Sequence, residues 1–192
     1  MLPRAWVSPE RRYRLITLRC TRKLLRLLDG NPVDCALEAT AALGNWYGNL
    51  VPTVAGELVV LANERTLLSV AVPVQMVDRV FIEFPERVYN LLRMIGVPTQ
   101  IALQECAELE TVMLARTESR SVLGSLNEIA LHYQLVAERD SGRNSLSLSA
   151  VERQLSGHLH GPLNYVHPAD IARELLRERY GPLQQGGDNV EK

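Results

Sequence analysis

The segment that most constrains this fold is LVVLANERTLLSV, Leu58–Val70, in which two apolar runs flank four polar residues. Both runs are apolar at successive positions, a pattern typical of strands covered on both faces. We therefore expect strands at Leu58–Ala62 and Leu67–Val72, joined as a central hairpin. An Asn at the first position of a turn bonds the backbone two residues on, which predicts Asn63–Thr66 as a structural turn with Glu64 and Arg65 in solvent. The functional alternative makes Glu64 an acid/base group or Arg65 an anion contact.

Other strands and helices follow from periodicity and capping signals. Alternating apolar residues predict a strand at Tyr13–Cys20, and a further strand is expected at Trp46–Val54. Thr111–Arg116 could continue the helix before it or form a fifth strand, and its Thr/Val content favours the strand. Helical spacing predicts helices at Thr21–Gly30, within 33–44, at Val74–Phe84, from Pro85 to Gly96, at Thr99–Glu108 and at Pro168–Tyr180. Two further helices are expected at the capping boxes Ser125–Glu128 and Ser149–Glu152.

This element order predicts an α+β fold. We expect a mainly antiparallel sheet of four to five strands, a β-meander plus the N-terminal strand, covered by C-terminal helices. The 192 residues, 46% of them hydrophobic, suit one domain with a sizeable core. The predicted division is a basic extension at 1–12, a single domain at 13–182 and a disordered tail at 183–192.

The net charge of −1 hides a strong asymmetry along the chain. Residues 1–28 hold eight Lys/Arg against one acid, a local charge of +7, and the remainder sums to −8. The favoured interpretation is that the two parts face each other within the fold, because the arginines alternate with strand residues. The alternative is a nucleic-acid contact through basic residues of this segment, namely Arg11, Arg12, Arg14, Arg22 and Lys23.

Other compositional features exclude several classes. The three cysteines form neither a disulfide framework nor zinc spacing, which fits a reducing cytoplasm. No signal peptide and no uncharged run of about 18 residues is present, so we expect no membrane contact. His158, His160, His167 and Asp170 could form a metal cluster, but His167 fits the position before a helix-opening Pro, which argues against one. We predict no metal and no cofactor.

The remaining candidates for a binding site are polar or aromatic residues near predicted turns and helix starts. Trp46 either caps the core or stacks on a ligand ring, and Ser125 either caps a helix or helps hold an anion at its N-terminus. The full candidate set is Trp46, Asn63, Glu64, Arg65, Thr66, Ser125 and Asn127. We predict no catalytic residue, because no nucleophile has a base nearby in the sequence.

Several phrases occur together in order: LRCTRKLL, LGNWYGNLV, LVVLANERTLLSVAVPV, SRSVLGSLNEIA and GPLNYVHPADIARELL. Together they resemble a family of small bacterial proteins that carry a domain of unknown function, often encoded in plasmid or other accessory regions. The resemblance covers roughly residues 15–177. It implies a bacterial cytoplasmic α+β domain. From these observations we expect a non-enzymatic binding module that acts with a protein partner or as a homo-oligomer. The alternatives are nucleic-acid binding through the basic segment and an enzyme with a polar pocket near the hairpin turn.

Overall fold

A computed structural model describes residues 14–34, 38–140, 147–158 and 166–182. The predicted N-terminal extension and C-terminal tail lie outside these residues, as do Arg11, Arg12 and His160. No helix in the described part of the chain is both long enough and apolar enough to cross a membrane.

The predicted α+β class is confirmed. Five strands form one sheet: β1 (Ile16–Cys20), β2 (Trp46–Thr53), β3 (Gly56–Asn63), β4 (Ser69–Pro73) and β5 (Val112–Arg116), in the order β4-β3-β2-β1-β5. The meander β2-β3-β4 is antiparallel, whereas β1 pairs in parallel with both β2 and β5. The predicted hairpin is therefore β3-β4, and the predicted fifth strand is β5. The hairpin is not central as predicted, because β4 is an edge strand of the sheet.

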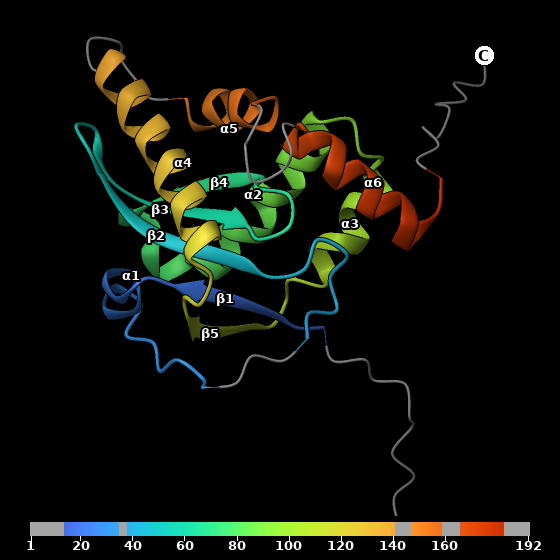
Figure 1. Cartoon of the computed structure of the whole chain (residues 1–192), viewed down its shortest axis with the longest axis horizontal. Helices are drawn as coiled ribbons and strands as arrows, with labels where there is room; N and C mark the ends of the chain where they lie inside the picture. The colour runs from blue at the N-terminus through green and yellow to red at the C-terminus, as the bar shows by residue number, and fades with distance from the viewer. Residues whose placement is uncertain (1–13, 35–37, 141–146, 159–165, 183–192) are drawn as a thin grey trace, which may run out of the picture.

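Helices cover both faces of the sheet (Figure 1). They are α1 (Arg22–Leu27), a 3₁₀ helix η1 (Val74–Arg79), α2 (Val80–Met94), α3 (Thr99–Ala107), α4 (Arg120–Arg139), α5 (Leu148–Ser156) and α6 (Pro168–Tyr180). Alternate residues of each strand point to opposite faces. One face packs Ile16, Leu18, Trp46 and Leu61 against α1, α2, α3 and α6. The other packs Tyr47, Val60 and Ala71 against α4 and α5.

The predicted helix start at Pro85 is wrong, because α2 begins at Val80 and continues through this proline. An internal proline costs a helix about 3 kcal/mol. The inward stripe of α2 includes Val80 and Phe84 before the proline and Val88 after it, and all three are buried. Burying one such side chain contributes about 1.5–3 kcal/mol. The burial of Val80 and Phe84, the two residues before the proline, therefore offsets the free-energy cost of Pro85.

Both predicted capping boxes are also wrong. The α4 helix begins at Arg120 and is capped by Ser119, whose Oγ accepts from the Val122 N–H at 3.3 Å. Ser125 lies inside α4, buried, with its hydroxyl bonded to the Ser121 carbonyl. The α5 cap is Ser147. In both helices a serine upstream of the predicted one is the N-cap. The predicted Ser-x-x-Glu sequence lies inside the helix and caps nothing.

The helix predicted within 33–44 is absent from the described residues there, 33–34 and 38–44. Val33 instead bridges to Ala115 beside β5, and the segment before β2 forms a loop. Loop backbone groups bond across the fold: the Thr40 N–H donates to the Leu15 carbonyl at 3.0 Å. These long-range bonds replace the local bonds that a helix would have made.

Candidate functional site

Asn63, the first residue of the NERT turn, is fully buried and hydrogen-bonded at both ends of its amide. Its Oδ1 accepts from the backbone N–H groups of Arg65 at 3.1 Å and Thr66 at 3.0 Å, and from the Thr66 hydroxyl at 3.0 Å. Its Nδ2 donates to the carbonyls of Leu43 at 3.0 Å and Asn45 at 3.1 Å. The predicted Asn turn is confirmed, and this side chain also ties the turn to the loop before β2.

The two charged residues of the turn behave differently from each other. Glu64 is half-buried, and its Oε1 accepts from the Asn45 N–H at 3.3 Å. Arg65 is exposed, but its Nη1 donates to the Ala42 carbonyl at 2.8 Å. The prediction of a fully solvated turn tip therefore holds for Arg65 alone, and both side chains bond the same loop.

The other candidate residues lie apart from the turn's polar atoms. Trp46 pairs with Asn63 in the β2-β3 register, and its fully buried ring meets Phe84 edge-to-face at 5.1 Å between centroids. Its environment is the face of the sheet covered by α2. Ser125 and Asn127 lie on α4, which covers the opposite face, Ser125 buried and Asn127 exposed. The seven candidates therefore lie on both faces of the sheet and are not gathered at one place.

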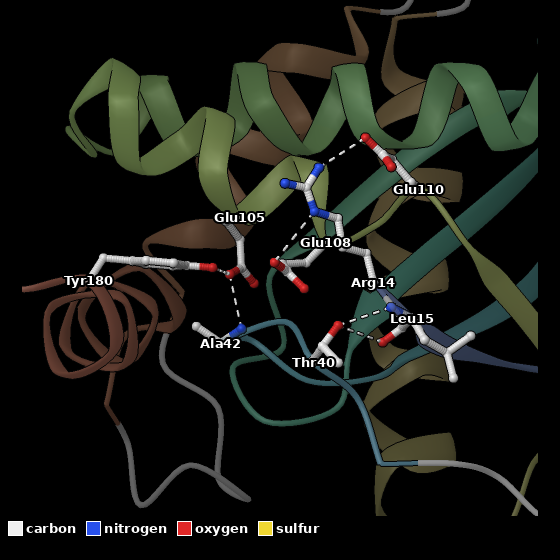
Figure 2. A network of polar contacts seen from close by, with 8 residues as sticks. All are labelled: Arg14, Leu15, Thr40, Ala42, Glu105, Glu108, Glu110 and Tyr180. Carbon is white, nitrogen blue, oxygen red and sulfur yellow. Dashed lines mark hydrogen bonds and ion pairs between the residues drawn. The ribbon is translucent and has the colours of Figure 1, made fainter. Parts of the chain in front are cut away.

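Sequence reasoning missed the most connected buried acid, Glu105 on α3. Its Oε2 accepts from the Ala42 N–H at 2.9 Å and from the Tyr180 hydroxyl at 2.8 Å (Figure 2). Its Oε1 accepts from the Leu43 N–H at 2.8 Å. Burial raises the pKa of this carboxyl group, against the lowering effect of these bonds. Glu105 therefore joins α3, α6 and the loop before β2.

Two basic residues, Arg19 in β1 and Arg14 two residues before it, pair with acids of the remainder of the chain. Arg14 lies 3.2 Å from Glu110 and 3.9 Å from Glu108 (Figure 2). Arg19 lies 2.7 Å from Glu118 and is almost fully buried. These pairs support the interpretation that the basic segment and the acidic remainder face each other. Arg14, a candidate nucleic-acid contact, is paired with acids of the same chain.

The basic residues of α1 are not paired in this way. Arg22 and Arg26 are exposed and line a groove of about 450 Å³ with Arg116, the last residue of β5. None of the three guanidinium groups makes a hydrogen bond or ion pair with a described residue. Asp29 is the one acid among the lining residues. We call this the α1 groove; its residues are Arg22, Leu25, Arg26, Asp29, Gly30, Pro32 and Arg116.

Packing holds α1 in place although it has only six residues. Leu24 is fully buried against β2, where a Cβ added at Gly48 would lie 2.6 Å from the Leu24 Cδ2. Thr21 is the N-cap residue, and its hydroxyl makes no capping bond but donates to the Asn49 Oδ1 at 3.0 Å. The absence of a side chain at Gly48 therefore lets the helix seat closely on the sheet and turns Arg22 and Arg26 outward.

One family model matches most of the chain. The family model described as Domain of unknown function (DUF6933) matches residues 17–171, from β1 into the first turn of α6. The chain belongs to this family. No curated protein and no solved structure matches it. The DUF6933 match includes Asn63, Glu105 and all of the α1 groove, whereas Tyr180 lies beyond it.

A second buried acid of this DUF6933 domain, Glu152 on α5, protects the edge of the sheet. Its Oε1 accepts from the Ala71 N–H of the edge strand β4 at 3.1 Å and from Arg87 at 3.5 Å. An unpaired edge N–H is a template for unwanted strand pairing, and α5 covers this one. Burial is the main cause that raises the pKa of the Glu152 carboxyl group.

We predict that Glu152→Gln changes how stability depends on pH. A raised folded-state pKa stabilises the fold fully below the ordinary value of 4.5, and this contribution is lost as pH rises through the folded pKa. Gln keeps an oxygen for the Ala71 N–H and does not titrate. Urea unfolding from pH 4.5 towards neutrality should therefore show the wild type losing stability relative to Glu152→Gln. A relative gain for the wild type would contradict this, and exposed Glu110→Gln controls for loss of one charge.

The described residues contain no group of three or more His, Cys, Asp or Glu side chains placed to hold a metal ion. The rings of His132 and His158 lie 4.8 Å apart between centroids, joining α4 to the residues after α5. His167 is the N-cap residue of α6, as its position before Pro168 predicted.

Proposed function

We propose that the protein is a non-enzymatic interaction module that binds a short acidic segment of a protein partner in the α1 groove. The observation that carries the proposal is the convergence of three unpaired arginines on one concave surface. Like charges at positions i and i+4 of a helix destabilise it by about 0.2–0.5 kcal/mol, and Arg22 and Arg26 have this spacing. An anion bound between them relieves that repulsion.

The ligand chemistry follows from the guanidinium group. Its planar fork donates two parallel hydrogen bonds to a carboxylate or a phosphate. A carboxylate-bearing peptide is favoured over nucleic acid by the charge of the whole chain. Nucleic-acid-binding domains are strongly basic overall, whereas this chain carries a net charge of −1 and its residues after 28 sum to −8. That acidic remainder would repel a long polyanion but leave a short acidic segment free to bind.

The setting we propose is a bacterial cytoplasm, with the partner encoded beside this protein in an accessory region. The sequence resemblance supports that setting, and three cysteines without a disulfide framework are compatible with it. A second copy of the chain is the alternative partner, since exposed acids on α4 and α6 offer carboxylates of their own.

Substitution of the arginines tests this proposal. We expect Arg22→Ala and Arg26→Ala each to weaken binding of a fluorescein-labelled oligoglutamate peptide about tenfold, since one charge-assisted hydrogen bond contributes about 1.5 kcal/mol or more. Lys23→Ala is the matched control, because Lys23 is an exposed cation of the same helix that does not line the groove. Fluorescence anisotropy at fixed salt measures all three.

Two outcomes would contradict the proposal. Equal losses for Lys23→Ala and Arg22→Ala would mean diffuse charge attraction without a groove. Tighter binding of oligothymidylate than of oligoglutamate, with a steep salt dependence, would favour the nucleic-acid alternative.

A further inference from the structure

A separate groove lies beside the NERT turn and has a different charge pattern from the α1 groove. Its volume is about 570 Å³, within the size range of small-molecule sites. Four charged side chains line it: Arg65 from the turn, Glu108 from the end of α3, and Glu178 and Arg179 from α6. Among the described lining residues two cations stand against two anions, so these charges balance, and they come from three chain segments. We call it the Arg65 groove.

Arg65 is pre-positioned in this groove by two contacts. Its Nη1 is anchored on the Ala42 carbonyl at 2.8 Å. Its stem crosses Gly44, where an added Cβ would lie 3.1 Å from the Arg65 Cδ and the φ of +81° favours glycine. Its other guanidinium nitrogens make no hydrogen bond with a described residue. A cation held in this way loses little conformational freedom when it binds a carboxylate.

The opposite charges are also available. Glu178 and Arg179 are exposed and form no ion pair with a described residue. Glu108 meets only the Nε of Arg14, at 3.9 Å, which is a weak, partly exposed pair. The rest of the described lining is Thr40 together with the apolar side chains of Ala39, Ala41, Ala42 and Leu175.

We propose that the Arg65 groove binds a free amino acid with an apolar side chain. The carboxylate pairs with Arg65, the ammonium group pairs with Glu108, and the apolar side chain lies against Ala39 and Leu175. A dianion would meet the two glutamates, and a dication would meet the two arginines, so the lining selects for a molecule that carries both charges. This site is independent of the α1 groove and does not depend on the partner proposed for it.

Three matched probes test the selection. Leucine carries both charges, leucinamide only the positive one, and 4-methylpentanoate only the negative one. Amide NMR titration should give saturable shifts with leucine at Ala42 and Gly44, and affinities about tenfold weaker for both single-charge analogues. Arg65→Ala should weaken leucine and 4-methylpentanoate binding but leave leucinamide binding unchanged, and Glu108→Gln should weaken leucine and leucinamide binding.

Arg179→Ala provides a second variant if Arg65→Ala perturbs the fold, because Arg179 has no bonded partner among the described residues. We expect it to weaken leucine binding. Arg139→Ala, at the distant end of α4, is the matched control and should leave leucine affinity unchanged. The inference is overturned if leucine produces no saturable shift near Gly44, or if 4-methylpentanoate or leucinamide binds as tightly as leucine.

Discussion

Asn63→Ala should destabilise the fold by roughly 3–5 kcal/mol, because it removes a buried amide that makes five hydrogen bonds. The substitution leaves the N–H groups of Arg65 and Thr66 without their acceptor and the Leu43 carbonyl without its donor. Each buried polar group left unpaired costs about 1–3 kcal/mol. Urea denaturation followed by tryptophan fluorescence measures the loss, since Trp46 lies opposite Asn63 in the sheet.

Asn127→Ala is the control for this variant. Asn127 was an equal candidate in the sequence, but it is exposed in the middle of α4, where Ala is the better helix former by up to about 0.7 kcal/mol. We expect a small stabilisation. Similar losses in the two variants would mean that Asn63 is not the link between the turn and the loop.

Glu105→Ala should cost roughly 2–4 kcal/mol. It leaves the N–H groups of Ala42 and Leu43 and the Tyr180 hydroxyl without their shared acceptor (Figure 2). The substitution also removes the desolvation cost of burying a carboxylate. This gain offsets part of the loss, so the expected destabilisation is smaller than that of Asn63→Ala. Tyr180→Phe removes one of the three bonds and should cost about 1 kcal/mol.

Glu110→Ala is the matched control for Glu105. The Glu110 side chain is 63% exposed and pairs only with Arg14 at the surface, so its removal should change the free energy of unfolding by less than about 1 kcal/mol. If Glu105→Ala is as mild as Glu110→Ala, the loop before β2 does not depend on this carboxylate.

Much of the fold could be predicted because its signals are local. The β3-β4 hairpin, β5, α3 and α6 follow from periodicity, and Pro168 and Tyr180 bound α6 as predicted. The Asn63 turn was predictable for the same reason, since two of its bonds reach only two and three residues along the chain. The prediction failed at Pro85 and at the two capping boxes, where burial and upstream serines outweighed the local rule.

The buried acids could not be predicted, because their partners are distant in the sequence. Glu105 bonds backbone groups 62 and 63 residues away, and Glu152 bonds one 81 residues away. Both have the appearance of solvated helix residues in the sequence. The α1 groove also needs the fold, since Arg116 joins Arg22 and Arg26 only when β5 pairs beside β1. The excess of basic residues near the N-terminus was the one available signal, and it did not separate the paired arginines from the unpaired ones.

Amide NMR mapping of oligoglutamate on the full-length protein tests the central claim most directly. A bound acidic segment should shift the backbone signals of Leu25, Gly30 and Arg116, which line the α1 groove from three places in the chain. The signals of α4 and α5 on the opposite face should stay in place. Shifts spread over all exposed basic residues, or confined to residues outside the groove, would contradict the account.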